Sequence, residues 1–355
     1  METVQPESSP ENAPHAQNMV NNFPYDERLS VWEISQLWLF YQTSSLRKCI
    51  FQYVIAQTQD PDMKAFYLDT LNTINAQLST MTNLFLSADF SVPQGFTDKD
   101  VEPNAKRLFS DSLTLNFFRM MNRFRFVKLA HLLPLIIRPD LQEFFNSALV
   151  SEQNLMNRSK NLAIKKGIHT KPPYTPVSDK VNFISNQTWY GEFFKKGRSI
   201  NVLELTHVFL QLDTKQIQRA IRLGFCQVVK DPKVKAFMIK GLDILDKVIE
   251  RWSIILNKED LPLPISWECE VTDSLDSPFS DKLMLYQILL MITYSVYDNG
   301  FSLANCNRKD IVAAFAKAEL EQIPYGKDAL DLMIANGWME EIPLIIDRKK
   351  MIGLI

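Results

Sequence analysis

The segment Glu204-Leu205-Thr206-His207 has the residue types and spacing of a metal-binding pair on a helix. Residues three apart project from the same side of a helix, so the Glu204 carboxylate and the His207 imidazole could bind one divalent metal ion. Glu204 also follows Asn201 by three residues, a spacing at which its carboxylate completes a capping box at a helix start. The sequence therefore leaves open a metal-binding role and a structural role for Glu204.

A complete di-metal centre in a four-helix bundle needs one Glu from each of two helices and Glu-x-x-His from each of the other two. The chain has 4 His, namely His15, His131, His169 and His207. The segment 171 residues before the Glu204 motif is Glu33-Ile34-Ser35-Gln36, which lacks His. We therefore predict no di-iron centre and no cofactor, with a single divalent metal at Glu204 and His207 as the alternative.

Other chemical signatures are sparse. The sequence has no Gly-rich phosphate loop, Ser-His-Asp set or Cys-His nucleophile arrangement, so no catalytic residue is predicted. This pattern favours a protein that is not an enzyme without deciding the question. Arg119, Arg123 and Lys128 form a basic edge on one predicted helix, for which we expect a solvated face or pairing with Glu143 or Glu152 rather than phosphate binding.

These residues belong to a chain that is one unit written twice. Asp60-Pro61-Asp62-Met63-Lys64-Ala65-Phe66 recurs 171 residues later as Asp231-Pro232-Lys233-Val234-Lys235-Ala236-Phe237. Asp before Pro is typical of a helix start, because the carboxylate caps free N–H groups and Pro fits the first helical position. Phe-Ser-Asp marks the third helix of each half, at 109–111 and 279–281, where the offset is 170.

Each half is expected to form four helices, and the predicted fold is all-α with two tandem four-helix bundles. The predicted boundaries are a disordered tail at 1–27, the first bundle at 28–172, a linker at 173–199, the second bundle at 200–345 and a C-terminal tail at 346–355. Trp189, Tyr190, Phe193 and Phe194 are expected to pack the linker against a bundle. Asp298-Asn299-Gly300 predicts a break after Tyr297 in the third helix of the second half.

The third predicted helix of the second half is unusually apolar, with no charged residue between Lys282 and Asp298. A helix that is apolar on all sides must be covered on all sides. We expect the first bundle, the aromatic linker or another subunit to cover it, and self-association as a homodimer is one of these alternatives.

Composition limits the partners. The net charge of −2 gives no reason to expect nucleic-acid binding, and the longest apolar run is too short for a membrane span. The N-terminus has no basic segment followed by an apolar run, so we predict a cytoplasmic protein.

The loop Gln94-Gly95-Phe96-Thr97-Asp98, the doubled Phe-Ser-Asp starts and Pro172-Pro173-Tyr174 resemble an uncharacterised family of spore-forming Firmicutes, known as a domain of unknown function. The resemblance implies two tandem ferritin-like four-helix bundles, distantly similar to the spore coat protein F family, and no established activity.

Three functions follow as hypotheses. The first is a non-enzymatic structural or interaction protein with a protein partner, for which the resemblance implies a place in the spore. The second is a metal-binding or redox protein with a degenerate ferritin-like site in the second bundle. The third is a carrier of a small ligand bound between the bundles, which a large apolar pocket would favour.

Overall fold

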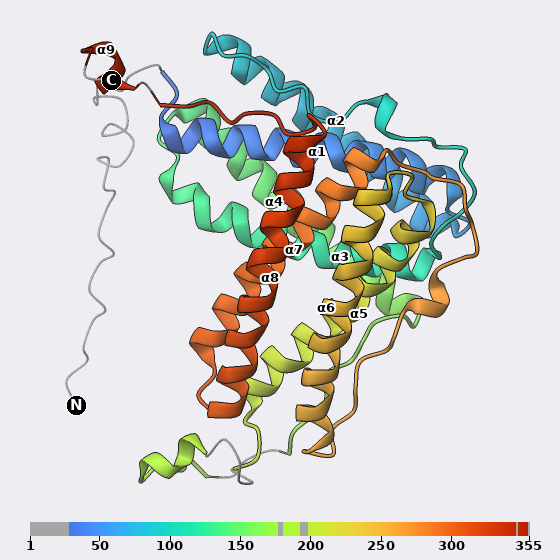
Figure 1. Cartoon of the computed structure of the whole chain (residues 1–355), viewed down its shortest axis with the longest axis vertical. Coiled ribbons are helices and arrows are strands. Elements are labelled where there is room, and N and C mark those ends of the chain that lie inside the picture. The colour runs from blue at the N-terminus through green and yellow to red at the C-terminus, as the bar shows by residue number, and fades with distance from the viewer. Residues whose placement is uncertain (1–27, 177–179, 192–197, 346, 354–355) are drawn as a thin grey trace, which may run out of the picture.

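The computed structural model describes residues 28–176, 180–191, 198–345 and 347–353 (Figure 1). Within these ranges the regular structure is helical, and the strand-like pairings are two isolated bridges, which confirms the all-α prediction. The predicted tail at 1–27 and the linker residues Phe193 and Phe194 lie outside the described residues.

Four long helices form each unit. Those of the first unit are α1 (Val31–Gln57), α2 (Pro61–Ser87), α3 (Asp111–Leu132) and α4 (Pro139–Lys165). Those of the second unit are α5 (Val202–Val228), α6 (Pro232–Asn257), α7 (Asp281–Asn305) and α8 (Lys309–Ala335). The short helical segments are η1 (Asp98–Asp100), η2 (Leu133–Leu135), η3 (Gln187–Tyr190), η4 (Glu268–Glu270) and α9 (Arg348–Met351).

The helices start where the caps predict. Ser30 and Asn201 form capping boxes with the Glu three residues later, and Asp60 and Asp231 each accept two backbone N–H groups of the first turn. The predicted break after Tyr297 is wrong, because α7 continues to Asn305. Packing of α7 against α8 outweighs the local preference of this segment for a turn.

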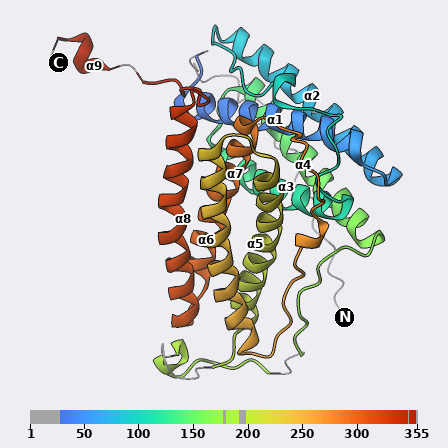
Figure 2. The ribbon, with the colours of Figure 1, turned by 45° about the vertical axis from the view of Figure 1, so that its right-hand side comes forward.

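The two units have the same helix order. In each, the first two helices pack as a hairpin, the last two pack as a hairpin, and the second and fourth helices pack together. Figure 2 shows the helices of the second unit side by side, with α1 and α2 lying across one end of them.

The units meet through the long loops that follow α2 and α6. Val101 pairs with Phe279, and Phe109 pairs with Val271, as isolated antiparallel bridges. Val101 and Val271 are equivalent in the repeat, as are Phe109 and Phe279, so each bridge has a counterpart with the units exchanged. The hydrogen bond from Glu102 N to Pro278 O, of 2.8 Å, is likewise matched by one from Thr272 N to Leu108 O, of 3.0 Å. The two units are thus related as the subunits of an isologous dimer are.

One apolar core crosses this contact. Tyr53 of α1 meets Phe279 edge-on at 5.2 Å between ring centroids, and Phe96 lies 5.1 Å from Tyr286 of α7. Most side chains of the first half of α7 are buried, and Gln287 contacts Met121 of α3. The first unit therefore covers the apolar α7, as one of the alternatives predicted.

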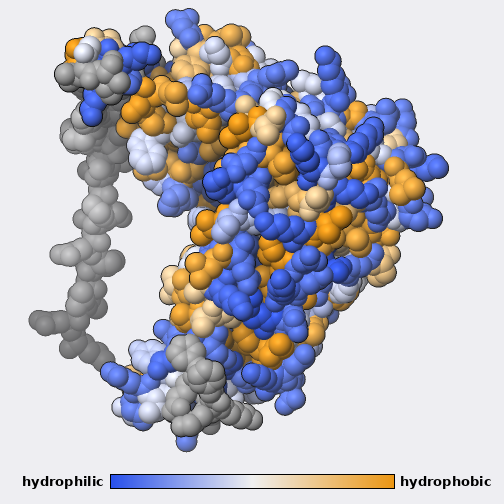
Figure 3. Space-filling model, in the orientation of Figure 1, coloured by the Kyte–Doolittle hydropathy of each residue, from blue (hydrophilic) through white to orange (hydrophobic). Residues whose placement is uncertain are grey.

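The outer surface is mixed. On the face in Figure 3, hydrophilic residues are interspersed with hydrophobic ones over both units. Among the helices of the described ranges, none is long and apolar enough to cross a membrane.

Candidate functional site

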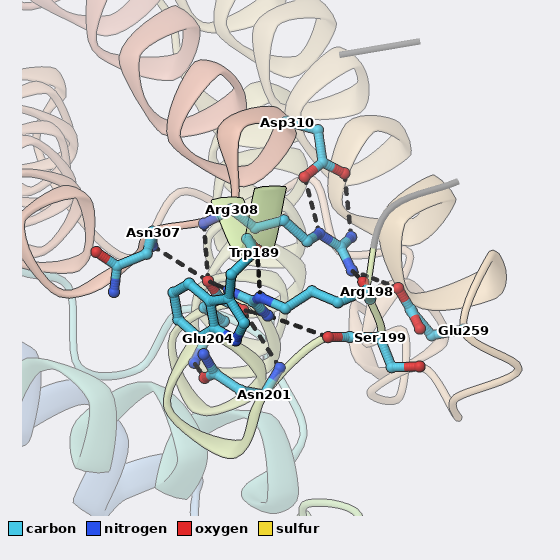
Figure 4. A network of polar contacts seen from close by, with 9 residues as sticks. All are labelled: Trp189, Arg198, Ser199, Asn201, Glu204, Glu259, Asn307, Arg308 and Asp310. Atoms are coloured by element: carbon cyan, nitrogen blue, oxygen red, sulfur yellow. Dashed lines mark hydrogen bonds and ion pairs between the residues drawn. The ribbon is translucent and has the colours of Figure 1, made fainter. Parts of the chain in front are cut away.

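The predicted metal ligand Glu204 lies at the start of α5, fully buried in a network of hydrogen bonds (Figure 4). Its two carboxylate oxygens accept from both terminal nitrogens of Arg198, each at 2.7 Å, and Oε1 also accepts from Arg308 N at 2.8 Å. Burial alone would raise the pKa of Glu204, but these hydrogen bonds outweigh it and lower the pKa to about 2. Glu204 is therefore ionised at neutral pH and joins Arg198 and Arg308 to the start of α5.

His207 lies one turn further along α5. Its Nδ1 is 3.1 Å from Ser302 Oγ of α7, and burial lowers its pKa. Within the described part of the chain, no group of three or more His, Cys, Asp or Glu side chains is placed to hold a metal ion. A metal at Glu204 and His207 stays a prediction, and it would have to compete with Arg198 for the carboxylate.

The first unit explains why a Glu is at this position. Glu33 accepts from the backbone N–H groups of Ile137 and Arg138 at 3.1 and 2.8 Å, as Glu204 accepts from Asn307 and Arg308. In both units this Glu ties the start of the first helix to the start of the fourth. The second copy adds Arg198, which stacks on the Trp189 ring at 3.8 Å and so attaches the linker to the second unit (Figure 4).

Each unit has a buried cation at its centre, which the sequence analysis did not identify. In the first unit, Arg125 of α3 donates to Glu152 Oε1 of α4 at 2.7 Å and to Thr43 and Ser44 of α1 at 2.9 and 2.8 Å. It also lies over the Phe40 ring at 3.5 Å. Burial and the neighbouring Arg47 lower the pKa of Arg125 to about 9.

The second unit places a different cation in the same region. Lys215 of α5 is fully buried and donates to Gln322 of α8 at 3.1 Å. Gln322 is the repeat equivalent of Glu152, and Lys215 is the equivalent of Ser44. Burial lowers the pKa of Lys215 to about 7. A cation at the bundle centre opposes the binding of a metal ion there. The signal in the sequence is a basic residue at helical spacing from buried apolar residues, since Lys215 follows Leu212 by three residues and Arg125 precedes Leu129 by four.

A groove of about 120 Å³ lies in the first unit, between α1 and α3. Its walls are mostly apolar, with Leu39 and Ile50 from α1 and Phe117 and Phe124 from α3. Leu290 of α7 lines it from the second unit. An engineered protein cavity of about 150 Å³ holds a benzene molecule, so this groove has room for part of a small organic ligand.

The equivalent gap in the second unit is filled. There α5 packs against α7, and Arg123 of α3 reaches across the unit boundary to Thr214 Oγ1 at 3.2 Å and to the Tyr294 hydroxyl. The repeat equivalent of Arg123 is Thr293, a small residue that lines the groove of the first unit without filling it.

Both alternatives predicted for the basic edge are wrong, because the described structure shows Arg119, Arg123 and Lys128 neither on a solvated face nor paired with Glu143 or Glu152. Arg123 lies between the units, 3.8 Å from Asp298, and Arg119 lies 3.0 Å from the His169 ring. Lys128 lines the groove. The physical reason is that α3 packs against α5, so the second unit covers the polar side of α3.

Comparison with known proteins agrees with the repeat. The model of a family described as a protein of unknown function, DUF3231, matches residues 17–181 and again residues 190–351. A solved structure from Bacillus halodurans C-125, described as that of a candidate spore coat protein, is 15% identical, with a TM-score of 0.39. The similarity covers 42% of this chain and 98% of that one. No curated protein matches significantly. The chain belongs to the DUF3231 family and carries its unit twice, in tandem.

Proposed function

We propose that this protein is a non-enzymatic binding protein whose first unit holds a small, largely apolar molecule in the groove between α1 and α3. The observation that supports the proposal is the groove itself, open in the first unit and filled by Arg123 in the second. Burial of apolar surface is the main driving force for a ligand in such a site.

The other functions predicted from the sequence stay predictions. They are a structural or interaction role with a protein partner or a second copy, association with the spore, and metal binding at Glu204 and His207. The groove supports the carrier hypothesis more directly, because it places an apolar opening where a bundle of this kind would otherwise be packed.

A neutral fluorescent dye, N-phenyl-1-naphthylamine, tests the proposal because its emission rises in apolar surroundings. We expect saturable binding of one dye per chain. Leu39→Trp should fill the groove and abolish binding, while the matched control Leu210→Trp, at the equivalent position on α5, should bind as the wild type does. Both residues are half-buried, so the two changes are comparable in their effect on packing. Absence of saturable binding, or equal loss in both variants, would refute the proposal.

A further inference from the structure

The charge around the groove is unbalanced. Arg47, Arg125 and Lys128 line it, and no Asp or Glu is among the described residues that do so. The carboxylate that pairs with two of these cations is that of Glu152, which does not line the groove: its Oε1 accepts from Arg47 and from Arg125, each at 2.7 Å. One buried carboxylate thus faces two guanidinium groups, and nothing offsets the third cation.

Lys128 lacks a counter-charge. Among the described residues it makes neither a hydrogen bond nor an ion pair, although it is half-buried. Burial and the nearby Arg125 lower the pKa of Lys128 to about 8. Arg47 also has a buried Nη2 without a hydrogen-bond partner in this part of the structure. Buried cations and donors without partners are costly, so the groove favours an anion as occupant.

The second unit shows that this imbalance is specific to the groove. The repeat equivalents of Arg47, Arg125 and Lys128 are Gln218, Ser295 and Asp298. Gln218 donates to Ser295 at 3.1 Å, and Asp298 accepts from Gln211 at 2.8 Å. Each of these groups thus has a polar partner within the second unit, whereas the first unit presents cations at the same positions to an apolar space.

The shape of the groove indicates the rest of the ligand. Lining residues on α1 run from Gln36 to Val54, which corresponds to about 27 Å along the helix axis. Apolar side chains lie toward both ends, including Ile50 and Phe117 on one side of the cations and Leu132 on the other. A small volume spread over this length fits a thin, flexible chain better than a compact ring system.

We infer that the ligand of this groove is a single-chain amphiphile, an alkyl chain with an anionic head group held by Lys128 and Arg47. The inference rests on the proposed function and specifies the ligand. Carboxylate and phosphate head groups share the required chemistry, since both accept charge-assisted hydrogen bonds from ammonium and guanidinium groups.

Displacement of the neutral dye by dodecyl compounds below their micelle concentrations tests the inference. Dodecanoate and dodecyl phosphate should displace the dye at least about tenfold more tightly than dodecanol, given the strength of hydrogen bonds to charged groups. Dodecyltrimethylammonium should be the weakest. The tighter of the two anions identifies the head group. Each methylene added from octanoate upward should tighten binding about fourfold until the groove is full.

The variant Lys128→Gln should bind dodecanoate about tenfold more weakly and dodecanol unchanged, and Lys128→Arg should restore the preference. Lys64→Gln, which removes an exposed charge on α2, is the matched control and should bind as the wild type does. Equal displacement by acid and alcohol, or an unchanged preference in a folded Lys128→Gln, would overturn the inference. Dye binding would still stand in that case, so failure of the head-group assignment is distinguishable from failure of the proposed function.

Discussion

The Glu152→Gln substitution removes the charge that holds the centre of the first unit together. Glu152 is 1% exposed, and both Arg47 and Arg125 donate to its Oε1 at 2.7 Å. Burial tends to raise the pKa of Glu152, but the two guanidinium groups outweigh it and lower the pKa. The pair is therefore ionised at neutral pH, and the amide that replaces the carboxylate keeps the shape of the side chain without its charge.

The magnitude distinguishes two mechanisms. If only hydrogen bonds mattered, the amide could replace them in part and the cost would be about 1 kcal/mol. Loss of the charge leaves Arg125 buried among Phe40, Thr43 and Ser44 without a counter-charge, and breaking a buried ion pair costs about 3–5 kcal/mol. We expect a decrease of this larger size in the free energy of unfolding.

Urea denaturation followed by circular dichroism at pH 7 measures this change, and because one apolar core crosses both units we expect a single transition. The control is the reverse exchange, Gln322→Glu, which puts a carboxylate beside the buried ammonium of Lys215. It should alter stability by less than about 1 kcal/mol, because the attraction to Lys215 offsets the cost of burying the new charge. If Glu152→Gln lowered the free energy of unfolding by less than about 1 kcal/mol, the charge of Glu152 would not be needed for stability.

Two further changes test the buried cation of the second unit and the contact between the units. The pKa of Lys215 is lowered from 10.5 to about 7, so the unfolded state binds more protons between these pH values. The free energy of unfolding should therefore rise with pH in this range by up to ~1.4 kcal/mol per pH unit. Lys215→Met should flatten this rise in urea titrations between pH values of about 7 and 10, and an unchanged slope would contradict the assignment. Gly224→Ala places a Cβ 2.3 Å from a Phe109 ring carbon and should lower stability by ~1–3 kcal/mol. In the control, Gly300→Ala, the new Cβ meets nothing within 4 Å and should stabilise α7 by up to ~1 kcal/mol. Thermal unfolding of both variants measures these changes.

The helices could be predicted because their start signals are local. The capping boxes at Ser30 and Asn201 and the Asp-Pro starts at Asp60 and Asp231 depend on residues within one turn. The break predicted after Tyr297 failed for the opposite reason, because packing against α8 is not visible in the local sequence.

The candidate site could be predicted only in part. The spacing of Glu204 and His207 suggested a metal pair, while the spacing of Asn201 and Glu204 suggested a capping box, which the structure shows. The partner that completes the surroundings of Glu204 is Arg198, which comes from the linker before α5. The ion pair of Arg125 with Glu152 joins α3 to α4 across the bundle, and no periodicity along one helix specifies such a contact.

The groove follows from how the two copies diverged, and this divergence becomes visible only when the arrangement of the units is known. Because the units are related like the subunits of a dimer, the residue that fills a gap in one unit belongs to the third helix of the other. Arg123 of the first unit fills the gap between α5 and α7, and its equivalent Thr293 leaves the gap between α1 and α3 open. Five residues after Arg123 on α3, Lys128 lines the open groove, while its equivalent Asp298 on α7 lies near Arg123 in the filled gap. The exchange of Arg for Thr and of Asp for Lys thus turns a closed contact into an apolar groove with an unmatched cation. A duplicated chain can keep one unit as a packed support and use the other as a binding site, since only one of the two equivalent positions has to remain filled.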